Sequence, residues 1–161
     1  MAEARALEES FVAWAKPPSD TEEEKIANAE RMVNDALSAV EDLSVLDLSV
    51  FAQGSYASKT NVRLESDVDI AVRFNPVFGF HLPKGVSHAD VGIERVNPQE
   101  ERFKSMVEEA LVDKFGRLAV NTGDKAFNVR ENTCRISADV VPCIEHRQYT
   151  GRFDQLGNPI Y

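Results

Sequence analysis

Apolar side chains recur every three to four residues in three stretches of the chain, and this spacing predicts amphipathic helices. The stretches cover residues 3–15, about 19–43 and about 97–116. Ser19 and Asn97 are typical helix caps, and acidic residues follow each of them within the first turn. We therefore expect one short helix near the N-terminus and two longer helices with well-defined starts.

Alternating apolar and polar side chains predict strands between and after these helices. The predicted strands are Leu46–Gln53, Asp67–Phe74, Lys125–Arg130 and Cys134–His146. Residues 75–96 show no clean period and are predicted to form a long loop, which in a compact domain is usually functional or mobile. Helices, strands, a helix and further strands in this order predict an α+β (α/β) fold with a mixed sheet and flanking helices.

The length, charge and composition of the chain exclude some classes of protein. The chain has 161 residues, and we expect residues 1–161 to form one compact domain. Its formal charge of −9 disfavours non-specific nucleic-acid binding, because phosphates repel an acidic protein. No apolar run reaches the roughly 20 residues of a membrane helix, so no membrane contact is expected. Cys134 and Cys143 lie too far apart on one predicted strand to form a disulfide, and free thiols suit the cytoplasm.

Three aspartates are the strongest candidates for a chemical site. Asp67 and Asp69 stand two residues apart in a predicted strand, so both side chains should lie on one face. Asp139 stands among apolar residues in a later strand. Neighbouring carboxylates repel each other unless a cation lies between them, and an all-oxygen set favours Mg²⁺ or Mn²⁺ over Zn²⁺. A pair of aspartates alone is more often a solvated strand face, but the apolar surroundings favour a metal site.

A glycine–serine turn is the second candidate feature. Gly54-Ser55 directly follows a predicted strand and precedes a predicted helical turn at Tyr56–Asn61. Glycine permits close backbone approach to a phosphate, and a helix N-terminus offers free N–H groups. By itself such a dipeptide is most often only a turn. We interpret the Gly54-Ser55 turn as a local anion-binding site in an otherwise acidic protein.

The glycine–serine turn followed by Asp-x-Asp resembles the signature of the polymerase-β-like nucleotidyltransferase superfamily. The matching residues are Gln53-Gly54-Ser55, Ser66-Asp67-Val68-Asp69-Ile70 and, further along, Ala138-Asp139-Val140-Val141-Pro142. Glutamine before Gly-Ser and the third motif look like those of the bacterial cyclic-oligonucleotide synthases of anti-phage defence, which are relatives of the animal cyclic GMP-AMP synthase. The resemblance covers roughly Leu46 to Arg147, which is most of the chain.

The resemblance implies a Mg²⁺-dependent enzyme that makes cyclic or linear oligonucleotide second messengers from nucleoside triphosphates. It implies that Asp67, Asp69 and Asp139 are catalytic and hold two Mg²⁺ ions, which Mn²⁺ can replace. It also implies that Gln53, Gly54 and Ser55 bind the nucleotide. The implied protein partners are effector or regulatory proteins of a defence operon.

Family synthases continue into a helical C-terminal domain, whereas this chain ends at Tyr161. If this end is artificial, we expect little product from the isolated chain, together with self-association or weak stability because the surface that such a domain would cover is exposed. Two alternatives stay open. One is a minimal nucleotidyltransferase that adenylylates a partner protein, as in toxin–antitoxin pairs. The other is a non-catalytic module of the same fold.

Overall fold

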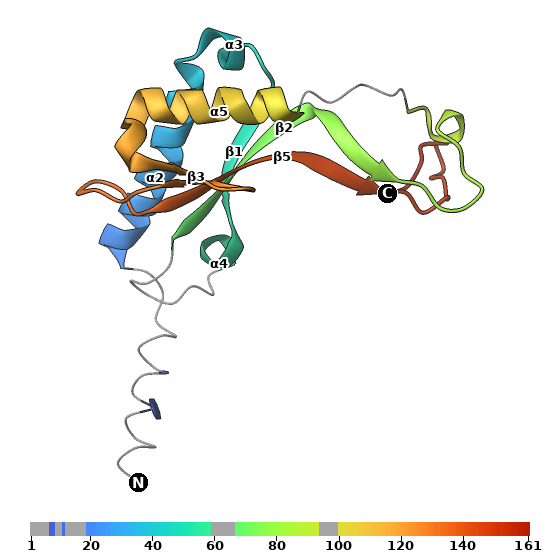
Figure 1. Cartoon of the computed structure of the whole chain (residues 1–161). Helices are drawn as coiled ribbons and strands as arrows, with labels where there is room; N and C mark the ends of the chain where they lie inside the picture. Colours follow the sequence, from blue (N-terminus) through green and yellow to red (C-terminus); the bar gives the residue numbers. More distant parts are fainter. Residues whose placement is uncertain (1–6, 9–10, 12–18, 59–66, 94–99) are drawn as a thin grey trace.

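The computed structural model describes residues 7–8, 11, 19–58, 67–93 and 100–161 of the chain. Most of the predicted N-terminal helix and the predicted start of the third helix lie outside these residues. The described part confirms the predicted fold class, a mixed sheet with flanking helices (Figure 1).

Five strands form one sheet in the order β1-β2-β5-β4-β3. The strands are β1 Leu48–Gln53, β2 Val68–His81, β3 Val120–Thr122, β4 Phe127–Val129 and β5 Ala138–Gln148. β2 and β5 run parallel to each other, and the other neighbouring pairs are antiparallel. The two longest strands therefore lie at the centre of the sheet.

Two long helices, α2 (Asp20–Ser38) and α5 (Glu100–Phe115), pack against one face of this sheet (Figure 1). α2 begins at Ser19, whose hydroxyl accepts a hydrogen bond from the Glu22 N–H over 3.4 Å. α5 ends before Gly116, whose φ of +83° suits glycine and terminates the helix. None of the described helices has the length and apolarity needed to cross a membrane.

The prediction of one helix over residues 19–43 is wrong at its C-terminal end. The chain leaves the helix after Ser38, because Val40 is extended with φ −94° and ψ 119°. A one-turn helix, α3 (Glu41–Ser44), follows this break. The remaining short helices are α4 Gly54–Ala57, η1 Ala89–Val91 and η2 Arg117–Ala119.

The prediction that residues 75–96 form a loop is wrong for its first part, because β2 continues to His81. Its pairing with β5 shifts register after Phe74 and resumes at Phe78 opposite Glu145. Pairing with β1 ends at Phe74, so the outer part of β2 belongs to a two-stranded ribbon that leaves the main sheet (Figure 1). Among the described residues, no part of β2 after Phe74 belongs to the hydrophobic core, and alternation of apolar and polar residues is therefore not required there.

Two smaller differences concern the later strands. β3 was not predicted, since three residues are too few to show a period. β5 begins at Ala138, so Cys134 lies before the strand and only Cys143 lies in it. Both thiols are free, as the sequence predicts.

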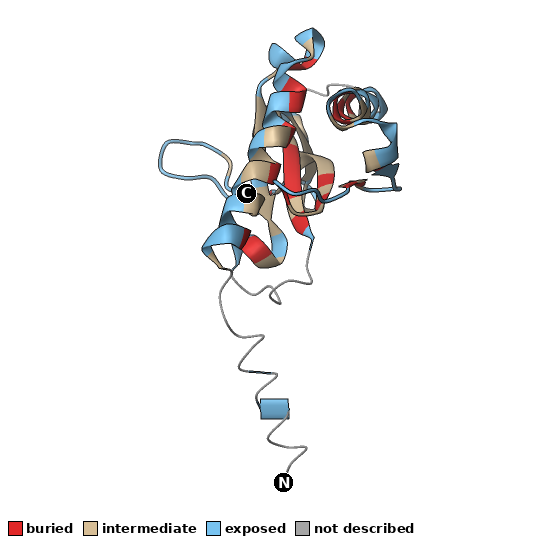
Figure 2. Ribbon diagram, turned by 90° about the vertical axis from the view of Figure 1, so that its left-hand side faces the viewer, coloured by how far each residue is buried: buried red, intermediate tan, exposed pale blue. Residues whose placement is uncertain are grey.

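The core lies between the helices and one face of the central strands. The strand residues Val68, Ile70, Val72, Ala138 and Val140 and the helix residues Val33, Leu37, Val107 and Leu111 are almost fully buried there. Figure 2 shows buried positions in red along the helix surfaces and strands that meet in this layer. Because side chains alternate along a strand, Asp69 and Asp139 lie on the opposite face of the sheet.

Candidate functional site

A row of polar side chains crosses the sheet on the face opposite to the helices. Its members are Gln53 in β1, Asp69 in β2, Asp139 in β5, Asn128 in β4 and Asn121 in β3. Each residue pairs in register with the next, so neighbouring side chains share one face. Asp69 and Asp139 are therefore neighbours across the parallel strands β2 and β5, at the centre of the row.

Asp67 lies at the edge of this row. It directly precedes β2 and is exposed to solvent, and it stands two residues before Asp69. The Nδ2 atom of Asn128 donates a hydrogen bond to its Oδ2 atom over 3.4 Å. The structure therefore brings the three predicted aspartates together from two different strands.

Gly54 lies against Asp69 and has no room for a side chain. Its φ is +69°, a left-handed conformation that is strained for other residues. A Cβ atom added to Gly54 would overlap the Oδ2 atom of Asp69. The glycine–serine turn therefore borders the aspartates directly, and both the backbone angle and the close contact require glycine.

Ser55 and Gln53 flank this glycine. Ser55 is the second residue of α4 and is half-buried, and Gln53 pairs with Asp69 across β1 and β2. α4 is a single turn and begins two residues earlier than predicted, so a helix dipole adds little here. A phosphate at this turn would be bound mainly by backbone N–H groups and the serine hydroxyl.

The surroundings of Asp69 raise the pKa of its carboxyl group above the ordinary value of 3.8. Partial burial is the largest cause, and the nearby charges of Asp139 and Asp67 add to it. Among the described residues, no lysine or arginine forms an ion pair with any of the three aspartates. Negative charge at this position is therefore uncompensated by the described part of the chain.

Asn128 is a site residue that the sequence reasoning missed. Its Nδ2 atom lies 2.9 Å from Asp139 Oδ1, 3.4 Å from Asp67 Oδ2 and 3.5 Å from Ser137 Oγ. The available signal was its position between Phe127 and Val129, which are both buried and leave Asn128 on the aspartate face. That signal depends on the strand pairing and is weak in sequence alone.

The three aspartates fit a divalent cation by their chemistry, since they are oxygen donors that need a positive charge between them. Their side chains are not yet arranged around one point. Within the described ranges, no group of three or more acidic, histidine or cysteine side chains has a geometry that would hold a metal ion. Asp69 lies over Gly54, while Asp67 and Asp139 both turn to the amide of Asn128. Binding an ion between all three would therefore require these side chains to rotate.

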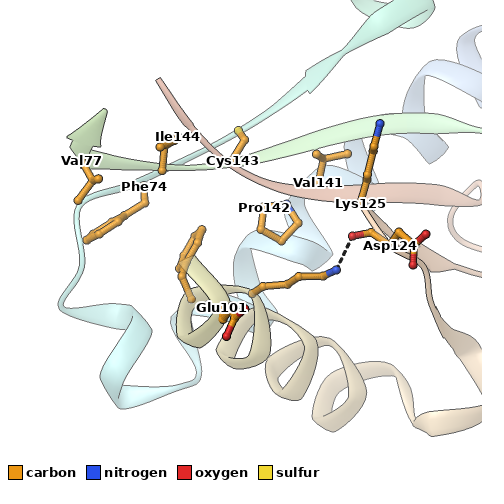
Figure 3. Close-up of a pocket in the computed structure, with 11 residues that line it drawn as sticks. Phe74, Val77, Glu101, Asp124, Lys125, Val141, Pro142, Cys143 and Ile144 are labelled. Carbon is orange, nitrogen blue, oxygen red and sulfur yellow. Dashed lines mark hydrogen bonds between the residues drawn. The ribbon is translucent and has the colours of Figure 1, made fainter. Parts of the chain in front are cut away.

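A cavity of about 440 Å³ lies further along β5, beyond the residues that pair with β4 (Figure 3). Its wall is mainly apolar and includes Phe103, Pro142 and Ile144. Lys104 also lines the cavity and donates a hydrogen bond of 2.6 Å to the carbonyl oxygen of Asp124. None of the three site aspartates lines this cavity, so it is separate from the candidate site.

Comparison with known proteins finds a matching family model and proteins of similar sequence. The family model for the nucleotidyltransferase domain matches residues 33–123. The chain is 46% identical over 147 residues to a cyclic dipyrimidine nucleotide synthase, CdnE, of Cecembia lonarensis, covering 91% of this chain and 50% of that protein. It is 45% identical over 144 residues to the synthase of the same name from Legionella pneumophila, covering 88% of this chain and 49% of that protein.

A solved structure is also similar. The Rhodothermus marinus CdnE c-UMP-AMP synthase, determined with Apcpp and Upnpp, superposes with a TM-score of 0.68 at 30% identity. The match covers 89% of this chain and 47% of that one. The chain spans about half the length of the curated relatives that it matches.

Proposed function

Because the chain belongs to the nucleotidyltransferase domain family, we propose that it carries the catalytic core of an enzyme that joins nucleoside triphosphates into cyclic or linear oligonucleotide messengers. The observation that carries this proposal is the adjacency of Asp69 and Asp139 across parallel strands, directly beside Gly54. The names of the relatives reported above, which are cyclic nucleotide synthases, support the same reaction class.

In this proposal the reaction is a displacement at phosphorus. A hydroxyl oxygen of one nucleotide attacks the α-phosphorus of another, the bond to the β-phosphate breaks, and pyrophosphate leaves with its electron pair. The proton of the hydroxyl passes to a neighbouring carboxylate. Mg²⁺ held by Asp67, Asp69 and Asp139 would neutralise the charge on the phosphates and stabilise both the attacking and the leaving oxygen.

The residues of the chain have separate tasks in this reaction. Asp69 and Asp139 place negative oxygen atoms at the centre of the sheet, where a cation is needed to offset their repulsion. Gly54 allows the backbone of the turn to approach the triphosphate, and Ser55 adds a hydroxyl donor. Gln53 borders Asp69 and is a further contact for the nucleotide.

The biological setting that we propose is signalling in bacterial anti-phage defence, inside the cytoplasm. The expected partners are nucleoside triphosphates and the effector or regulatory proteins of a defence operon. The relatives from Cecembia lonarensis and Legionella pneumophila are named as cyclic dipyrimidine nucleotide synthases, so cytidine and uridine triphosphates belong in any substrate test beside ATP and GTP.

The test is to incubate the chain with Mg²⁺ or Mn²⁺ and the four ribonucleoside triphosphates, singly and in pairs, and to identify products by mass spectrometry. A phosphatase-resistant oligonucleotide that wild type forms and Asp139→Asn does not would support the proposal. Asp113→Asn is the matched control, because Asp113 is exposed on α5 behind the sheet. A nucleotide attached to protein would favour the adenylylating alternative. Equal product from wild type and Asp139→Asn would remove the proposed site.

A further inference from the structure

We propose that Asn128 is a positioning residue of the aspartate site, one whose amide group holds Asp67 and Asp139 in place for a divalent cation. The inference rests on the proposed function, since it concerns the same cation. Its starting point is the geometry of one nitrogen atom that lies within hydrogen-bonding distance of two carboxylates, at 2.9 Å from Asp139 and 3.4 Å from Asp67.

The orientation of the Asn128 amide follows from its neighbours. An ionised carboxylate only accepts hydrogen bonds, so the NH₂ group and not the carbonyl oxygen must face Asp67 and Asp139. The NH₂ group has two hydrogens and can donate one to each carboxylate. No other side chain in the described part of the chain donates a hydrogen bond to either aspartate, so the amide is their shared donor there.

The backbone keeps this amide in position. Asn128 pairs in register with Asp139, and its neighbours Phe127 and Val129 are at most 1% exposed, which anchors β4 on the core side. The side chain is therefore directed onto the aspartate face by residues that cannot easily move. It is itself half-buried, so its replacement leaves the core intact.

Two effects on the cation site follow. The amide offsets part of the repulsion between Asp67 and Asp139 and keeps the two carboxylates near each other, which lowers the cost of collecting them around an ion. Each carboxylate also keeps a second oxygen that does not bond to Asn128. Outer residues of this kind typically contribute 10–100-fold to metal affinity.

Asn121 provides a matched control. It is the same residue type, pairs with Asn128 in register and lies on the same face, but it is one strand further from the aspartates. It is exposed. Any general effect of an asparagine substitution on this face should be seen equally at both positions.

The first measurement is Mn²⁺ binding to the chain without nucleotide, followed by electron paramagnetic resonance. Asn128→Leu keeps the approximate shape and removes the donor, and we expect it to weaken Mn²⁺ binding about 10–100-fold. Asn121→Leu should bind Mn²⁺ as wild type does, and Asn128→Gln, which retains an amide, should recover part of the loss. Affinity of Asn128→Leu within a factor of two of wild type would overturn the inference. If wild type itself fails to bind Mn²⁺, the proposed cation site falls as well.

The second measurement needs no metal. Asn128→Asp has nearly the same shape but replaces the donor with a negative oxygen beside Asp67 and Asp139. In EDTA at low salt we expect its melting temperature to fall clearly below that of Asn121→Asp, which adds the same charge one strand away. Equal melting temperatures for the two variants would show that the amide does not organise the carboxylates.

Discussion

The Asp69 carboxylate lies directly against the α-carbon of Gly54, in the space that a side chain at residue 54 would occupy. This contact joins the glycine–serine turn to the aspartate pair, which are separate motifs in the sequence. Any residue other than glycine would have to displace the Asp69 carboxylate, which neighbours Asp139 across the sheet. The position of the Asp69 carboxylate therefore depends on the absence of a Cβ atom at residue 54.

Gly54→Ala tests this contact. We expect the variant to lose roughly 1–2 kcal/mol of unfolding free energy from the left-handed backbone alone, and more from the displaced carboxylate. Gly92→Ala is the matched control, because Gly92 has a similar φ of +66° and open space where its Cβ would lie. Urea denaturation of both should show the larger loss for Gly54→Ala, together with loss of nucleotide transfer in that variant only. Similar losses of unfolding free energy in the two variants, with nucleotide transfer retained in Gly54→Ala, would show that the Asp69 carboxylate moves aside at little cost.

The raised pKa of Asp69 predicts that the substitution Asp69→Asn increases the free energy of unfolding, by an amount that depends on pH. Because the folded state binds the Asp69 proton more tightly than the unfolded chain does, stability falls as pH rises from below the ordinary value of 3.8 through the raised value. In EDTA at pH 7, Asp69→Asn should therefore be more stable than wild type. The gain should shrink when pH is lowered below about 4, where the unfolded carboxyl is also protonated.

Urea midpoints of wild type and Asp69→Asn at several pH values measure this difference. Asp113→Asn, on the exposed surface of α5, serves as the comparison and should show no such gain. A lower stability of Asp69→Asn at pH 7 would mean that the site favours the charged carboxylate even without a cation.

A bound nucleotide with Mg²⁺ should raise the melting temperature of wild type by mass action on the folded state. At a ligand concentration 100 times Kd the expected stabilisation is about 2.7 kcal/mol. The shift should be absent in Asp67→Asn/Asp69→Asn and present in Asp113→Asn. Differential scanning fluorimetry with each triphosphate, with and without EDTA, measures it. A shift of the same size in the double variant would place nucleotide binding elsewhere.

The helix layer behind the site should contribute most of the stability. Leu111 in α5 is fully buried against the sheet, whereas Leu118 is 89% exposed. We expect Leu111→Ala to cost roughly 2–5 kcal/mol, because it removes transfer energy and leaves a cavity. Leu118→Ala should change stability by less than about 0.5 kcal/mol. Chemical denaturation of the two variants distinguishes these outcomes, and equal effects would contradict the assigned core.

Much of this fold could be predicted from the sequence, because the main elements carry local signals. Ser19 caps α2, Gly116 ends α5, and Ile70 and Val72 alternate with their neighbours in β2. The proximity of Asp67 and Asp69 follows from the two-residue period of a strand. That Asp139 lies beside Asp69 could not be derived from local patterns, because it depends on which strands are neighbours. In the structure β2 and β5 pair in parallel, and Asp69 lies opposite Asp139.

The parts that were missed depend on contacts between distant segments. Residues 75–81 continue β2 because they pair with β5, and no local period marks this. Asn128 belongs to the site through β4, a strand of three residues whose neighbours are set by the sheet order. The break between α2 and α3 depends on the extended backbone of Val40, which an apolar helical pattern conceals.

The most direct test of the central claim is a transfer assay with α-phosphate-labelled ribonucleoside triphosphates and Mg²⁺. Wild type and Asp67→Asn/Asp69→Asn are compared at equal concentration, after circular dichroism has shown that both are folded. We predict that label enters a phosphatase-resistant oligonucleotide only with wild type, and that EDTA abolishes its formation. Formation of the same product by the double variant at the wild-type rate would contradict the assignment of these aspartates as the catalytic site.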